Sequence, residues 1–210
     1  MTPADAAVVA QIKAEGVAVL PLLTPAELQA ARSDMDRMYS DVYSWADEEH
    51  TGERQLFDPP PETVGMFPGI ERCFTHPRIT KILREVMSEP QVPFLQALRT
   101  DRYLAGHRGV GPHQDGGNVR AIPYEKMATM VFLDDIGEDS GALEYVPGSH
   151  LRQLLPPESH PTKPPLPGSR CAEIDKSYEA GDFRPIAAKA GSIIFRKSCP
   201  LPFASPETLT

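Results

Sequence analysis

Residues 111–118 read GPHQDGGN and hold a histidine and a carboxylate, His113 and Asp115, two positions apart. In an extended strand, residues i and i+2 point to the same face, so both side chains can reach one metal ion. A histidine and a carboxylate are two of the three protein ligands of a non-haem Fe(II) facial triad, which a second histidine completes. The flanking glycines permit close backbone approach and a sharp exit from the strand. This stretch is therefore a candidate metal site, although short His-x-Asp patterns also arise in surface loops.

Apolar, β-rich runs on both sides of this motif predict a series of short strands. Proline, glycine or aspartate bounds each run, and these residues mark turns. The expected strands are residues 16–23, 92–104, 127–133, 142–146 and 191–195. Residues 156–168 hold six prolines and predict a loop, because proline cannot donate a hydrogen bond inside a sheet, whereas residues 178–187 have a mixed pattern.

The N-terminal half predicts three helices. The first covers residues 5–15, and the third covers residues 77–88 with one apolar face. The second begins where Thr24 and Glu27 can form a capping box around a proline at the first helical position, and we expect it to run to about residue 42. Residues 44–70 are acidic, then rich in proline and glycine, and predict a long loop with little regular structure.

Helices followed by several short, punctuated strands predict an α+β fold. The simplest arrangement is a double-stranded β-helix, or jelly roll, with the N-terminal helices packed outside it. The chain has 210 residues and shows no repeat or linker, so we expect a single domain over residues 1–210.

Composition excludes several classes of protein. The formal net charge of -8 and the lack of a basic stripe argue against a nucleic-acid partner. No apolar run is long enough for a membrane helix, and the N-terminus lacks the pattern of a signal peptide. The three cysteines have no paired spacing, which indicates a reducing compartment. We therefore expect a cytoplasmic protein.

Three stretches, in this order, resemble the phytanoyl-CoA dioxygenase-like family of Fe(II)/2-oxoglutarate-dependent oxygenases. The first is residues 16–28, GVAVLPLLTPAEL, and the second is residues 112–116, PHQDG. The third and most specific runs over residues 132–150, with FLDD, SGAL and VPGSH in succession. The resemblance extends from near residue 10 to near residue 195.

The resemblance implies a jelly roll that holds one Fe(II) at its mouth, with His113 and Asp115 as the first two ligands. It also implies 2-oxoglutarate as cosubstrate, O2 as oxidant and hydroxylation of a small-molecule substrate. By position in the family pattern, Leu98 and Met130 would face the cosubstrate, although apolar strand residues are more often part of a core.

The chain departs from this family at its C-terminal end. The family places a second histidine ligand where this sequence has Pro202 or Phe203, and no histidine follows His160. The family also places an arginine further on, which pairs with the far carboxylate of 2-oxoglutarate, and no arginine follows Arg196. We therefore expect a C-terminus that is cut short or altered over residues 198–210, and a weak enzyme or none.

The sequence leaves other functions open. His150 or His160 could complete the metal site, or the chain could be a non-catalytic jelly-roll protein that binds a ligand. A zinc-dependent or cupin-like protein is a further alternative, since zinc also binds histidine and carboxylate. Last, His113 and Asp115 could simply hydrogen-bond each other in a structural module. The sequence does not identify the substrate.

Overall fold

A computed structural model describes seven parts of the chain. The described residues are 1–39, 54–57, 65–87, 100–103, 127–138, 140–151 and 180–197. The predictions at Leu98, His113, Asp115 and His160, the predicted loop over residues 156–168, and the prediction for residues 198–210 lie outside these parts.

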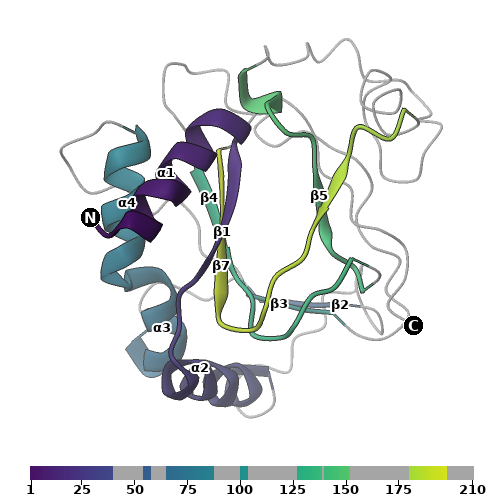
Figure 1. The fold of residues 1–210 in the computed structure, drawn as a ribbon. Coiled ribbons are helices and arrows are strands. Elements are labelled where there is room, and N and C mark those ends of the chain that lie inside the picture. Colours follow the sequence, from purple (N-terminus) through teal and green to yellow (C-terminus); the bar gives the residue numbers. More distant parts are fainter. Residues whose placement is uncertain are drawn as a thin grey trace, which may run out of the picture.

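The described elements are four helices, seven strands and one 3-10 turn, and they confirm the mixed α+β class (Figure 1). The helices are α1 (Pro3–Glu15), α2 (Pro25–Arg37), α3 (Pro68–Thr75) and α4 (Pro77–Met87), and the 3-10 turn is η4 (Ser149–Leu151). The strands are β1 (Val17–Pro21), β2 (Arg54–Phe57), β3 (Thr100–Tyr103), β4 (Met127–Val131), β5 (Leu143–Tyr145), β6 (Arg184–Ile186) and β7 (Ser192–Lys197). In this part of the chain, no helix is long and apolar enough to cross a membrane.

The central sheet has the order β1-β7-β4, and β7 is antiparallel to both neighbours. Ile194 of β7 lies opposite Val19 of β1 and Met130 of β4. Two further pairs of strands, β2 with β3 and β5 with β6, are also antiparallel. Because β1 comes early in the chain and β7 comes late, the central sheet joins an early segment of the chain to a late one.

Helices α1 and α4 cover one face of this sheet, which we call the outer face (Figure 1). Ile12 of α1 and Ile82 of α4 pack against Ile193 and Phe195 of β7, and all four side chains are fully buried. Side chains alternate between the two faces of a strand, so this contact fixes the orientation of every residue along β7.

Strand β5 lies on the opposite side of the central sheet (Figure 1). Tyr145 of β5 and Ile194 of β7 are buried together with Val17, and four partly buried residues pack around them. These four are Val19, Phe132, Leu143 and Ile186. The strands β5 and β6 therefore pack face to face with the central sheet, and we call the surface between them the inner face.

The predicted loop over residues 44–70 was wrong in two places. Residues 54–57 form β2, and α3 begins at Pro68, inside the predicted loop. The helix α3 has eight residues, too short for a clear repeating apolar pattern, and it is held by packing of Ile70 near Phe67 and Met38. Short elements of this kind depend on tertiary contacts more than on local preference.

Helix α2 covers Pro25–Arg37, and a short π-helical turn continues it over residues 38–39. The predicted end near residue 42 lies outside the described residues. Its predicted start is confirmed, because Thr24 and Glu27 form the capping box. The predicted apolar face of α4 is also confirmed, with Ile79, Ile82 and Val86 buried.

A partly buried ion pair ties α4 to α1. The Asp5 carboxylate, only 1% exposed, accepts hydrogen bonds from Arg78 at 2.8 and 3.0 Å. Arg78 also donates to the carbonyl of Pro21 at the end of β1. Hydrogen bonds from Arg78 and from Thr2 lower the pKa of Asp5 to about 2. The contact therefore joins both outer helices to the central sheet.

We expect Asp5→Asn to lower the free energy of unfolding at pH 7 by about 1–3 kcal/mol, because hydrogen bonds to a charged group are lost. The folded-state pKa of Asp5 lies below the unfolded value of about 3.9. The stability that the Asp5 carboxylate contributes is therefore present above pH ~4 and is lost as the pH falls toward 2.

Urea unfolding at a series of pH values would measure both effects. Asp134→Asn is the control, since Asp134 pairs with Arg32 at 83% side-chain exposure and should cost less than about 1 kcal/mol. An Asp5→Asn protein with the stability and acid sensitivity of the wild type would contradict this interpretation.

Candidate functional site

Of the four residues predicted to form the site, the structure describes Met130. It lies on β4, opposite Ile194 in the register of the central sheet. Directly opposed residues project from the same face of a sheet, so Met130 belongs to the inner face with Ile194. His113 and Asp115 precede β4 in the sequence, and Leu98 precedes β3, but all three are outside the described residues.

Most side chains of the inner face are apolar. The buried ones are Val17, Tyr145 and Ile194, and Met130 is partly exposed beside them. These side chains form the packed layer between the central sheet and β5.

Arg196 is the feature of the inner face that sequence reasoning missed. It follows Ile194 by two positions on β7 and lies opposite Val17 on β1 and Ala128 on β4. Alternation along the strand therefore places it on the inner face. Its Nε and Nη1 atoms are shielded from solvent, which is uncommon for arginine. The available signal was the sequence of β7, where arginine occupies an inward position directly after a buried run.

His150, considered from the sequence as a third metal ligand, instead contacts the C-terminus of α1. Its Nε2 atom lies 3.1 Å from the carbonyl oxygen of Lys13, so this nitrogen carries the proton and donates. The backbone N–H of Gly148 donates to Glu15 at 2.8 Å. These bonds use carbonyl groups that the end of a helix leaves without partners. His150 thus has a structural role here.

Gly16 makes this contact possible. It ends α1 in the left-handed conformation, with φ of 85°, and its carbonyl accepts from the N–H of Lys197 at 2.7 Å. A Cβ atom at this position would collide with Tyr145 Oη and with His150 Nδ1. The glycine of the GVAVLP stretch and the histidine of the VPGSH stretch are therefore two halves of one junction.

We expect Gly16→Ala to destabilise the protein by about 3 kcal/mol, from left-handed strain and from overpacking against Tyr145 and His150. Gly181→Ala is a matched control, because Gly181 has φ of 71° and nothing within 4 Å of the added carbon. The control should cost only the strain, about 1–2 kcal/mol. Denaturant unfolding of both variants gives the comparison, and equal losses would contradict the steric argument.

Other titratable groups do not form a site with these residues. Burial raises the pKa of Glu144, whose position on β5 alternates with the inward-facing Leu143 and Tyr145. His76 accepts a hydrogen bond from the N–H of Arg78 at the start of α4, on the helical side of the protein. Within the described ranges, no three His, Cys, Asp or Glu side chains are grouped as metal ligands.

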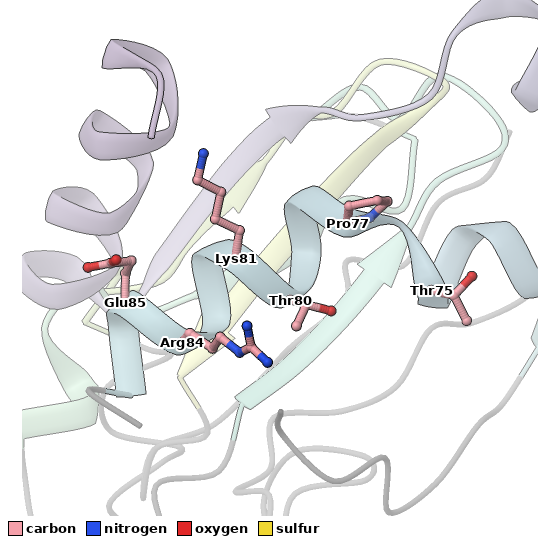
Figure 2. A pocket seen from close by; sticks show the side chains of 6 residues that line it. All are labelled: Thr75, Pro77, Thr80, Lys81, Arg84 and Glu85. Atoms are coloured by element: carbon pink, nitrogen blue, oxygen red, sulfur yellow. The ribbon is translucent and has the colours of Figure 1, made fainter. Parts of the chain in front are cut away.

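A surface pocket beside α4 is separate from the inner face (Figure 2). Helix α4 packs on the outer face of the central sheet through Ile79 and Ile82, so the sheet lies between this pocket and Met130. The pocket is lined by Thr75, Pro77, Thr80, Lys81, Arg84 and Glu85.

The sequence profile of the phytanoyl-CoA dioxygenase family matches residues 12–207. The chain belongs to this family. A comparison with curated proteins finds no match.

Solved structures of similar fold include several enzymes. The non-heme alpha ketoglutarate dependent carbocyclase SnoK from nogalamycin biosynthesis is 18% identical, with a TM-score of 0.69 over 99% of this chain and 79% of its own. HygX from Streptomyces hygroscopicus, solved with nickel and 2-oxoglutarate, is 16% identical, with a TM-score of 0.66 over 100% and 82%. EctD from S. alaskensis, solved with iron, is 17% identical, with a TM-score of 0.68 over 100% and 72%. At these identities the likeness shows the fold.

The donor types of His113 and Asp115 suit Fe(II), although their placement is outside the described residues.

Proposed function

We propose that this chain has the jelly-roll core of an Fe(II)/2-oxoglutarate-dependent dioxygenase and that its inner face is the cosubstrate site for a small-molecule hydroxylation. The observation that supports this most strongly is the match to the family over residues 12–207. The face-to-face packing of β5 and β6 on the central sheet agrees with it, because a jelly roll consists of two such sheets. The same proposal includes a cytoplasmic location and O2 as the oxidant.

His113 and Asp115 would hold the metal, as a histidine and a carboxylate of a facial triad. Bound iron would supply the oxidising chemistry, and the protein would bind and orient the substrate and exclude water. In this proposal Met130, and Leu98 on the preceding segment, line the cosubstrate site. Their apolar side chains would keep water away from the reacting groups.

The lack of a third protein ligand would distinguish this chain from an efficient member of the family. Pro202 or Phe203 occupies the position of the second histidine, and neither side chain can bind a metal. His150 donates through Nε2 to the end of α1, and its Nδ1 atom lies against Gly16, so we propose that it does not replace the missing ligand. Even losses outside the ligand shell typically reduce metal affinity about 10- to 100-fold, so a lost ligand should cost at least as much. We therefore propose that residues 198–210 depart from the family pattern and that iron binding and turnover are weak.

A non-catalytic protein that binds a carboxylate ligand on the same inner face is the alternative. Two observations together favour it. The side chains of the inner face are packed as a core, and Pro202 or Phe203 stands where the family has its second histidine.

We expect the purified chain to retain far less than one iron per protein, and to bind added Fe(II) only in excess. His113→Ala and Asp115→Ala should abolish this residual binding, because each removes one of the two remaining ligands. His76→Ala, at the start of α4, is the control and should bind as the wild type does. Metal analysis and anaerobic calorimetry measure these values. Stoichiometric iron with turnover would contradict weak binding, and equal binding by all variants would contradict the assigned ligands.

We expect Pro202→His or Phe203→His to raise Fe(II) affinity at least about 10-fold, because one of them restores the missing imidazole. The gain should depend on His113, so that Pro202→His combined with His113→Ala shows none. Anaerobic titration of each single variant identifies the position that gains. A failure of both single variants to bind more tightly than the wild type would contradict the proposed alignment of residues 202 and 203.

A further inference from the structure

A single residue, His76, connects helices α3 and α4 (Figure 2). Its backbone is extended, with φ of -58° and ψ of 126°, as expected at a helix N-cap and before a proline. Pro77 then occupies the first position of α4, where a helix offers no partner for the N–H that proline lacks. His76 therefore ends one helix and begins the next.

The His76 ring caps the first turn of α4. Its Nδ1 atom accepts a hydrogen bond from the backbone N–H of Arg78 at 3.2 Å, and its carbonyl accepts from the N–H of Ile79 at 2.9 Å. The usual N-cap side chains, such as serine, threonine and asparagine, accept through an oxygen that does not titrate between pH 5 and 8. An imidazole nitrogen accepts only when it carries no proton. The side-chain cap on α4 therefore exists only while this nitrogen of His76 is unprotonated.

The surroundings of the ring act against its protonation. Partial burial lowers the pKa of His76, and the charges of Arg72 on α3 and Arg78 on α4 lower it further, against the opposing charge of Glu27 on α2. Both arginines already have carboxylate partners, because Arg72 donates to Glu27 at 2.9 Å and Arg78 binds Asp5 of α1 at 2.8 Å. A proton on His76 would therefore add a third cation beside two arginines whose partners are already bound.

Helix α4 carries buried side chains that cover β7. Ile79, in the first turn after the cap, and Ile82, one turn further on, pack in one cluster with Ile193 and Phe195. The first turn of a helix has no intrahelical partners for its N–H groups, so it depends on its cap. Loss of the cap would loosen the turn that contains Ile79, and with it part of the cover on the outer face (Figure 1).

We propose that His76 is an acid-sensitive switch in the fold, and that its protonation releases the N-terminus of α4 and opens the turn between α3 and α4. The ordinary pKa of the ring is 6.5, and its folded-state pKa is lower. The unfolded chain therefore takes up the proton first as the pH falls. The stability that the cap contributes is present above pH ~6.5 and is lost between that value and the lower folded-state pKa. This switch concerns the helical layer and does not depend on the proposed iron site.

Two variants separate the two states of the cap. His76→Ala removes the acceptor at every pH, and His76→Asn keeps an acceptor that does not titrate. At pH 8 we expect the folding equilibrium constants of the wild type and His76→Asn to exceed that of His76→Ala by about 2- to 30-fold, the usual range for an N-cap. At pH 5 the wild type should lose most of this advantage, whereas His76→Asn should keep it. Urea unfolding of the three proteins at both pH values measures these constants, and the other titrating groups are common to all three.

Thr24→Ala is a matched control without an imidazole. Thr24 caps α2 through its hydroxyl, and hydrogen bonds from Thr24 and Arg72 lower the pKa of Glu27 to about 2. Neither group at this cap therefore titrates between pH 5 and 8. The loss of stability in Thr24→Ala should be the same at the two pH values.

The backbone N–H of Arg78 gives a local measure of the same event. In the wild type, its NMR signal should shift as the His76 ring titrates, with a midpoint below pH 6.5, and His76→Asn should lack this titration. A ring that titrates at or above pH 6.5 would contradict the proposal. A wild type that keeps its whole advantage over His76→Ala at pH 5, or that loses no more stability than His76→Asn between pH 8 and 5, would contradict it as well.

Discussion

The antiparallel pairing of β7 with β1 and β4 is the constraint on which the rest of this structure depends. It places a late strand between an early one and the strand that comes after the His-x-Asp motif in sequence. It also divides β7 into two sets of side chains. Ile193 and Phe195 pack against helices α1 and α4, and Ile194 and Arg196 lie on the side of β5 and β6. The helical layer and the candidate site are therefore two sides of one strand.

The contacts around Gly16 join the central sheet to α1 and to the turn after β5. The end of α1 contacts the turn after β5 through Gly148 and His150, and the N–H of Lys197 binds the carbonyl of Gly16. Three distant segments thus meet at a position where only glycine fits. This contact gives the VPGSH stretch a structural role in the fold. It also holds the start of β1 beside the end of β7.

Local signals in the sequence were enough to predict several elements. The capping box of Thr24 and Glu27 specifies the start of α2, and the apolar spacing of Ile79, Ile82 and Val86 specifies the buried face of α4. Both depend on residues within a few positions of each other, which is why the sequence predicts them. The mixed α+β class followed from the order of such elements.

Features that depend on distant contacts were not predictable in the same way. Helix α3 is stabilised by packing near Met38 of the α2 region, and the role of His150 depends on a carbonyl 137 positions earlier. The inward position of Arg196 becomes clear only when the register with β1 and β4 is known. Family resemblance supplied His113 and Asp115, and it also showed the departure at Pro202. The candidate metal ligands were therefore predicted from a motif, and they lie outside the described residues.

The most direct test of the proposed site is an anaerobic titration of the chain with Fe(II) and 2-oxoglutarate. The visible charge-transfer absorption of an iron chelate of 2-oxoglutarate reports both groups in one site. We predict that this absorption develops with Fe(II) in excess over the protein, as a site with two protein ligands requires. An absence of the absorption at every Fe(II) concentration would contradict the claim that the inner face is an iron and 2-oxoglutarate site.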